Sequence, residues 1–400
     1  MNGGGVTVAY SGVHQAYQIA CAAHEAGLLD GFYCSIVDAA GKWGRILSRV
    51  GGRHRLITRR IDSIPSNKLH ECPTPWLYQM AIARLFPGLK QDWLKANDHF
   101  DKYVAKRLER SRSSLFVGVE TCAARSFAAA KQLGMTLVLE CPGVDSEYLD
   151  ERASLAASQL GLSIERSADS QGMRERKDAE LNLADRVIVC SEYQKTTMER
   201  RGVDPGKFSV MPLWVDSAFW NVGPRHQPSS GPLRVLYAGR ISLRKGIPYL
   251  LQAAQACRGA VGLTLVGSID RDISPLLQTA SASASIHYPV CKSRLREFYA
   301  ENDLLVLPTL GDAFGFVALE AMACGLPVVV TENCGVPVPD PAWRVPVMDA
   351  EAIAARLEMY AGNRVALRED GERALHFARQ FTPERYRKGI GTALHRFLGQ

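Results

Sequence analysis

The sequence lacks the features that mark several common classes of protein. No two of its ten cysteines are spaced C-x-x-C, which argues against a zinc knuckle or a redox dithiol. No uninterrupted apolar run reaches the roughly 18–20 residues that a membrane-spanning helix needs, and no basic segment precedes an apolar stretch near the N-terminus. Since disulfide frameworks are typical of short secreted chains, we expect free thiols and a cytoplasmic protein.

Several nucleotide-binding and hydrolase motifs are absent as well. The sequence contains no G-x-x-x-x-G-K-[ST], no G-x-G-x-x-G after a strand, no H-E-x-x-H and no G-x-S-x-G. The sequence therefore lacks the characteristic motif of a P-loop nucleoside triphosphatase, a simple dehydrogenase, a zinc protease and an α/β-hydrolase.

Charge is unevenly distributed along the chain. Lysine and arginine number 48 against 41 aspartate and glutamate, a formal net charge of +7. Residues 42–60 hold seven of these cations and no anion, so the rest of the chain balances at 41 against 41. Apolar residues alternate with the cations at near-helical spacing. This predicts either a basic amphipathic segment that contacts an anionic membrane at its inner face, or a solvated or disordered insertion. Nucleic acid is a poor third interpretation because no recognition motif accompanies the charges.

Short apolar runs alternate with helical patterns along the chain. The first half predicts strands at 6–10, 32–37, 115–119, 136–139, 186–190 and 209–211, and helices at 14–26, 92–110, 121–133, 147–161 and 171–184. The second half predicts strands at 234–238, 261–266, 285–288, 304–307 and 327–331, and helices at 247–257, 293–301, 316–324 and from 349 onward. Such alternation favours parallel sheets with right-handed crossovers.

Composition divides the chain into two domains. A single hydrophobic core stops growing near about 250–300 residues, and residues 213–232 are rich in proline, glycine and serine, as is typical of a linker. We expect a doubly wound, Rossmann-like domain over 1–212, a second one over 233–381, and a helix over 382–400 that packs back on the first domain. Because open α/β sheets bind ligands at the carboxyl ends of their strands, the two domains should face one cleft.

The residues that carry chemistry are concentrated in the second half. Gly239 ends a predicted strand, and Arg240 and Lys245 lie in the loop that follows it. A guanidinium and an ammonium at the carboxyl edge of a sheet suit a diphosphate. Two solvated loop cations are the alternative interpretation.

A second segment, residues 303–330, begins with a strand that is continuously apolar, as in a strand buried on both faces. Gly315 then opens a helix whose N-terminus offers free N–H groups to an anion. Asp312 and Glu320 lie eight residues apart. Their carboxylates either accept hydrogen bonds from hydroxyls at two ends of an extended ligand, or are an N-cap aspartate and a solvated helix glutamate.

These segments together carry a resemblance. G-R-x-x-x-x-K-G, followed by D-A-F-G-F-V-A-L-E-A-M-A-C-G-L-P-V-V, resembles the donor-site signature of the family 4 glycosyltransferases, which are retaining enzymes of the GT-B fold. The spacing matches the E-x7-E element of that family, with Asp312 where glutamate is usual. Residues 184–193 and 210–216 also resemble the end of the family's first domain and its linker entry.

The resemblance implies a role for each matching residue. Arg240 and Lys245 would bind the donor diphosphate and stabilise the charge that grows on it as the sugar leaves. Glu320 would hold the ribose hydroxyls, and Asp312 would contact the transferred sugar. The other donor-binding candidates are backbone groups near the phosphates and residues of the nucleobase loop 289–292: Gly239, Phe314, Gly315, Phe316, Val290 and Cys291.

The family is thought to retain the anomeric configuration by departure and attack on the same face of the sugar, with the leaving phosphate as base. The resemblance therefore implies no metal, no cofactor and no separate catalytic carboxylate. Its default donor is a UDP-sugar, which is a substrate, and the acceptor is a hydroxyl.

The first domain offers weaker candidates for the cleft. Gly12 and His14 follow the first strand, and Glu120 and Glu140 follow two later ones. His14 could face the donor or simply begin a helix. Each glutamate either contacts the acceptor or ends a strand in solvent, and the second interpretation is favoured for both.

The sequence thus predicts a retaining hexosyltransferase that moves a sugar from a nucleotide-diphosphate sugar to a glycan, glycolipid or small-molecule hydroxyl, as in polysaccharide biosynthesis. Two alternatives remain. One is a sugar-nucleotide epimerase or phosphorylase on the same fold. The other is a non-catalytic sugar-nucleotide-binding subunit, which rests on aspartate at position 312.

Overall fold

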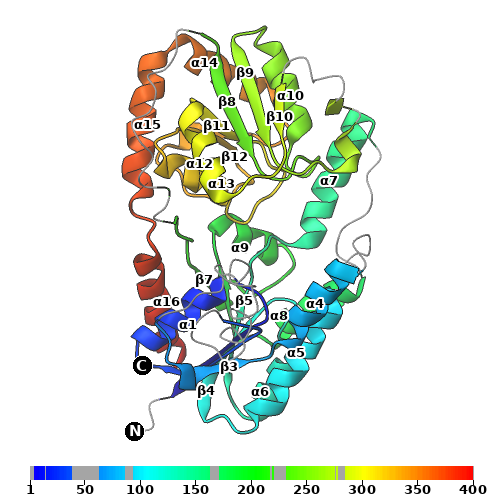
Figure 1. Ribbon diagram of the computed structural model, residues 1–400, viewed down its shortest axis with the longest axis vertical. Helices are drawn as coiled ribbons and strands as arrows, with labels where there is room; N and C mark the ends of the chain where they lie inside the picture. Colours follow the sequence, from blue (N-terminus) through cyan, green and yellow to red (C-terminus); the bar gives the residue numbers. More distant parts are fainter. Residues whose placement is uncertain are drawn as a thin grey trace.

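The computed structural model of the chain describes residues 4–13, 15–37, 63–85, 93–162, 171–216, 219, 231–274, 276–277 and 284–399. These residues form two parallel β-sheets, each covered by helices, that follow one another along the long axis of the molecule (Figure 1). The doubly wound α/β architecture that the alternation of strands and helices predicts is confirmed. The basic segment 42–60 and His14 lie outside the described residues.

The first sheet has the strand order β3-β2-β1-β4-β5-β6-β7, and every neighbouring pair is parallel. Six of these strands correspond to predicted ones. β3 does not, because its three residues are half-buried at the sheet edge and include His70 and Glu71. The strands are β1 (Gly5–Tyr10), β2 (Leu29–Cys34), β3 (Leu69–Glu71), β4 (Ser113–Val119), β5 (Thr136–Glu140), β6 (Arg186–Val189) and β7 (Phe208–Val210).

The helices of this domain are α1 (Gln15–Glu25), α4 (Thr74–Leu85), α5 (Trp93–Leu108), α6 (Ala124–Gln132), α7 (Ser146–Leu160), α8 (Gln171–Leu183) and α9 (Glu192–Glu199). The sequence patterns did not predict α4 or the eight-residue α9. They also placed the start of α6 at residue 121. Thr121 has φ = 73°, a left-handed conformation that an α-helix cannot contain, so α6 begins three residues later.

The second sheet has the order β10-β9-β8-β11-β12-β13. Its strands are β8 (Leu233–Ala238), β9 (Val261–Val266), β10 (Ala284–His287), β11 (Leu304–Leu307), β12 (Val328–Thr331) and β13 (Arg344–Val345), and its helices are α10 (Ile247–Ala256), α12 (Lys292–Glu301), α13 (Phe316–Ala323), α14 (Ala350–Gly362) and α15 (Arg364–Ala378). β11 and β12 are buried throughout, as their continuously apolar sequences predict for strands covered on both faces.

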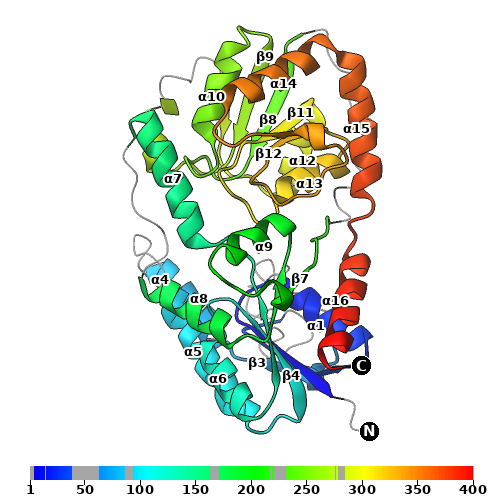
Figure 2. The same ribbon diagram turned by 180° about the vertical axis from the view of Figure 1, so that it is seen from behind.

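The last helix, α16 (Pro383–Phe397), returns to the first domain and packs on α1, as predicted (Figures 1 and 2). Arg387 of α16 donates to Gln18 at 2.9 Å, and its Nε lies 2.8 Å from the Glu25 carboxylate. The chain entering the linker meets the same region, because Val215 N donates to Phe381 O at 3.0 Å. Two chain segments therefore connect the domains. Within the described ranges, no helix has both the length and the apolar character needed to cross a bilayer.

Candidate active site

The loop after β8 is fixed by hydrogen bonds. The hydroxyl of the buried Tyr237 donates to Arg240 O at 2.6 Å, and Leu310 N donates to Arg244 O at 3.0 Å. Gly246 has φ = 71°, and a Cβ there would collide with Pro308 O. Because β8 and β11 are neighbours in the sheet, these contacts bring the loops after the two strands together at one edge.

The two predicted cations have different surroundings. The side chain of Arg240 is 63% exposed, and its guanidinium lies 3.8 Å from the Asp270 carboxylate. Lys245 is more enclosed, and its Nζ donates to Asp312 Oδ2 at 2.5 Å. The alternative of two solvated cations is therefore wrong for Lys245, since it pairs with the other candidate residue.

Asp312 organises the turn that leads into α13. Its Oδ1 accepts hydrogen bonds from Phe314 N at 3.2 Å and Gly315 N at 2.9 Å. Gly315 has φ = 75°, and a Cβ there would lie 2.6 Å from Cys334 Sγ. The sequence requires glycine at this position both for the left-handed backbone and for the close approach of residue 334.

Glu320 lies on α13 and contacts a buried phenol. Tyr299 donates to Glu320 Oε2 at 3.0 Å. Burial, with a further contribution from the Glu320 charge, raises the pKa of Tyr299 above its usual value. The carboxylate is thus oriented by α12 and is not merely solvated.

The predicted nucleobase loop follows β10. Val290 is half-buried, and Cys291 is exposed at the N-terminal cap of α12. A hydrogen bond with Ser293, together with backbone N–H groups, lowers the pKa of the Cys291 thiol. Tyr288, which the sequence reasoning did not single out, is 80% exposed beside this loop. Only its place after a short strand could have drawn attention to it.

On the first domain, Gly12 lies in the loop after β1, where a Cβ would contact the ring of Tyr10. The neighbouring Ser11 donates to Asn97 Oδ1 at 2.9 Å, and Ser35 donates to Ser11 O at 2.5 Å. The loop is thereby tied to α5 and to the end of β2.

Glu120 follows β4 on a strained turn. Thr121, the next residue, has φ = 73°, and such outliers cluster at functional sites. The turn is held by the buried carboxylate of Glu180, which accepts from Thr121 N at 2.5 Å and Ala123 N at 2.7 Å. Lys177 Nζ lies 3.5 Å from the Glu120 carboxylate. Glu120 therefore has a fixed place and an ion-pair partner at the carboxyl edge of the sheet.

Glu140 ends β5 and is only 3% exposed, so its interpretation as a strand end in solvent is wrong. Its Oε2 atom is buried and has no hydrogen-bond partner. Burial, with a smaller contribution from the Glu120 charge, raises the pKa of Glu140 to about 8. The carboxyl is therefore mostly protonated at neutral pH.

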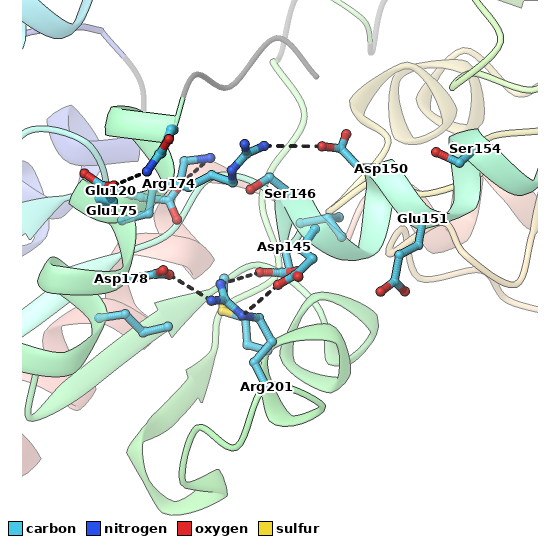
Figure 3. A pocket seen from close by; sticks show the side chains of 16 residues that line it. Glu120, Asp145, Ser146, Asp150, Glu151, Ser154, Arg174, Glu175, Asp178 and Arg201 are labelled. Carbon is cyan, nitrogen blue, oxygen red and sulfur yellow. Dashed lines mark hydrogen bonds and ion pairs between the residues drawn. The ribbon is translucent and has the colours of Figure 1, made fainter. Parts of the chain in front are cut away.

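A pocket of about 670 Å³ opens beside Glu120, between the start of α7 and α8 (Figure 3). Thirteen of its sixteen lining residues are polar or charged. Arg201 is one of the lining residues and donates to Asp145 and Asp178 at 2.9 Å each. The wall formed by α7 reaches the second domain, because Asp150 pairs with Arg244 from the loop after β8. The pocket therefore adjoins the loop that carries Arg240 and Lys245.

The first domain also contacts the turn that leads into α13. Ser191, the N-cap of α9, donates from Oγ to Ala313 O at 2.6 Å. Asn333 Nδ2 donates to Tyr148 OH at 3.2 Å. The sequence reasoning missed these residues, since Ser191 reads only as a helix cap and an interdomain contact leaves no local pattern.

The structure thus gathers two sets of candidates at facing sheet edges. Arg240, Lys245, Asp312, Phe314, Gly315 and Glu320 lie in the loops and the helix that follow β8 and β11 of the second sheet. Gly12, Glu120 and Glu140 lie at the ends of β1, β4 and β5 in the first sheet. Two Rossmann-like domains that face each other define the architecture of a GT-B protein. Here the second domain contributes cations and a helix N-terminus, and the first domain contributes fixed carboxyl groups.

Comparisons with known proteins agree with this architecture. Residues 232–363 match the family described as "Glycosyl transferases group 1". The chain is 30% identical over 192 residues to a D-inositol 3-phosphate glycosyltransferase of Arthrobacter sp. strain FB24, covering 42% of this chain and 45% of that protein. It is 32% identical over 190 residues to the amylovoran biosynthesis glycosyltransferase AmsK of Erwinia amylovora, covering 43% of each. The chain thus spans less than half the length of these curated relatives.

Solved structures show the fold over the whole chain. Anabaena HepE in complex with UDP superposes with a TM-score of 0.61 at 15% identity, over 98% of this chain and all of that one. Sucrose-phosphate synthase from Thermosynechococcus elongatus gives a TM-score of 0.64 at 18% identity, over 99% of each chain. Residues 232–363 therefore match the group 1 glycosyltransferases, as the resemblance implied, and the GT-B fold that it implied is confirmed.

Proposed function

We propose that the protein transfers a sugar from a nucleotide-diphosphate sugar to a hydroxyl acceptor, with retention of the anomeric configuration. One observation carries this proposal. Arg240, Lys245 and the N-terminus of α13 lie in loops that follow two adjacent strands, at the edge that faces the first domain. Cations and free N–H groups together suit a diphosphate that gains charge as its sugar leaves.

The proposed reaction needs few groups. The bond between the anomeric carbon and the donor phosphate breaks, and the acceptor oxygen bonds to the same face of the sugar. The proton of the acceptor hydroxyl passes to the departing phosphate oxygen, which releases the nucleoside diphosphate. Arg240 and Lys245 stabilise the leaving group, and losing one such preorganised group typically costs about 3–4 kcal/mol of transition-state stabilisation. Glu320, oriented by Tyr299, accepts hydrogen bonds from the ribose hydroxyls.

The donor and its requirements follow from the same groups. UDP is the first nucleotide to test, because HepE was solved with UDP and has the same fold. The cations of the chain supply positive charge at the diphosphate, so we propose a reaction without a metal, whose rate EDTA leaves unchanged. We also propose a cytoplasmic protein, since all ten cysteines are free thiols.

The pocket beside Glu120 is the proposed acceptor site. Carboxylates, Arg201 and serine hydroxyls line it, and such groups bind hydroxyl-rich molecules through hydrogen bonds. The relatives include an enzyme of amylovoran biosynthesis and one named for D-inositol 3-phosphate. A glycan or a polyol is therefore the first class of acceptor to test, in keeping with a role in polysaccharide biosynthesis.

The test begins with thermal unfolding in the presence of UDP, GDP, ADP and their sugars, because a bound ligand raises the unfolding temperature by mass action. Hydrolysis of the stabilising donor is then measured for R240A and K245A. Each should lose at least tenfold in turnover, while R368A, which removes an exposed cation on α15, should not. Unchanged turnover in both site variants would refute the assigned roles. An isomerised donor or a dependence on free phosphate would identify an epimerase or a phosphorylase, and binding without transfer a non-catalytic subunit.

A further inference from the structure

The Asp312 carboxylate is held by three donors at the start of α13. Lys245 Nζ donates to Oδ2 at 2.5 Å, and Phe314 N and Gly315 N donate to Oδ1 at 3.2 and 2.9 Å. Only 29% of the Lys245 side chain and 22% of the Asp312 side chain are exposed. One ammonium and two backbone N–H groups thus bind one carboxylate at the edge of the candidate donor site.

These donors are the ones that a phosphate group would use in the same place. Each backbone N–H has a single hydrogen, so it cannot bond fully to two anions. Two anions on one ammonium also repel each other across a few ångströms, and this repulsion is stronger in a partly buried site than in water. The carboxylate and the diphosphate of a donor therefore compete for Lys245 and the N-terminus of α13.

The side chain of Asp312 can rotate away from its partners while its backbone stays in place. Asp312 N donates to Asn333 O, and Gly335 N donates to Asp312 O, each at 2.9 Å. Rotation about the side-chain bonds of Asp312 is then sufficient to release both the lysine and the N–H groups. Aspartate suits this exchange, because its short side chain closes a turn on the N–H groups two and three residues ahead.

We propose that the Asp312 carboxylate occupies the anion-binding position of the donor site and is displaced when a nucleoside diphosphate binds. This inference rests on the proposed function and extends it. The carboxylate weakens the affinity for the diphosphate, since only the fraction of molecules in which Lys245 is released can bind it. It also takes Lys245 back when the product leaves, so it favours product release.

The test is the affinity of D312N for free UDP, measured by isothermal titration calorimetry. An asparagine Oδ1 can still accept from Phe314 N and Gly315 N, but its Nδ2 cannot pair with an ammonium. UDP should bind at least fivefold more tightly to D312N than to the wild type. Uridine, which has no phosphate, should show no such gain.

The matched control is E332Q, which removes an equal charge from an exposed side chain in the adjacent loop and should change UDP affinity less than twofold. D312S serves as a second variant if D312N unfolds, since serine also accepts from a helix N-terminus. If Asp312 acts only on the transferred sugar, free UDP will bind both variants as it binds the wild type, and the inference is overturned. If the wild type binds no nucleoside diphosphate at all, the proposed function itself fails.

Discussion

Replacing Glu140 with glutamine should stabilise the first domain at neutral pH and flatten its dependence on pH. The carboxyl is 3% exposed, its Oε2 has no partner, and its pKa is raised from 4.5 to about 8. Between these two values the native state holds a proton that the unfolded state has lost. Stability therefore falls as pH rises, at about 1.4 kcal/mol per pH unit.

The magnitude follows from that slope. Between pH 5 and pH 7 the wild type should lose about 2–3 kcal/mol from this group. Glutamine is neutral at every pH. The free energy of unfolding of E140Q should therefore exceed that of the wild type by about 3 kcal/mol at pH 7 and by less than about 1 kcal/mol at pH 5. In a domain of this size, 3 kcal/mol corresponds to about 6–12 °C in the unfolding temperature.

The assay is differential scanning calorimetry of both proteins from pH 5 to pH 8. E192Q is the control, because the Glu192 side chain is 76% exposed and should show no such trend. A difference in stability between E140Q and the wild type that stays constant across this range would show that Glu140 is ionised in the native state. The reasoning from burial would then be refuted.

Four further outcomes are expected. S191A loses the cap of α9 and leaves Ala313 O with only the weak thiol donor of Cys190, which should cost about 1–3 kcal/mol in urea unfolding and lower sugar transfer. T197V, which alters a buried hydroxyl of the same helix, should leave transfer unchanged, and equal transfer by S191A would contradict the interdomain role. G315A places a Cβ 2.6 Å from Cys334 Sγ at φ = 75°, so its unfolding temperature should fall and UDP should raise it less than in the wild type. Activity should be the same with and without EDTA, and a metal requirement would show as loss with EDTA and recovery with Mg²⁺. Sedimentation with anionic vesicles should fall when Arg53, Arg55, Arg59 and Arg60 are neutralised, and unchanged sedimentation would dispose of a membrane role for residues 42–60.

The sequence predicted the elements whose apolar patterns are strong. β11 and β12 are four-residue runs of valine, leucine and threonine that are buried throughout, and their period and length could be read directly. β3 and α9 were not predicted because each is short. α4 was missed although its sequence is apolar and opens with Thr-Pro, a helix-start signal.

The sequence predicted the part of the candidate site that lies within single segments, and it did not predict contacts between distant segments. Arg240, Lys245 and Glu320 could be found because residue types and spacing in one segment carry them. The ion pair between Lys245 and Asp312 could not, because it joins residues 67 positions apart and depends on the register of two neighbouring strands. Ser191 and Tyr148 reach the second domain only through the packing of α7 and α9, which no local pattern encodes. Glu140 was misjudged because burial at the end of a strand depends on what covers it.

The return of α16 to the first domain affects how the chain folds during synthesis. α1 ends at Glu25, and the helix that packs on it begins at Pro383, so more than 350 residues must be made in between. At roughly 5–20 residues per second, the buried face of α1 waits for tens of seconds. Until then it presents apolar surface that chaperones recognise, while the second domain completes its own sheet. A chain that ended before residue 383 would contain both sheets but lack the helix that packs on α1.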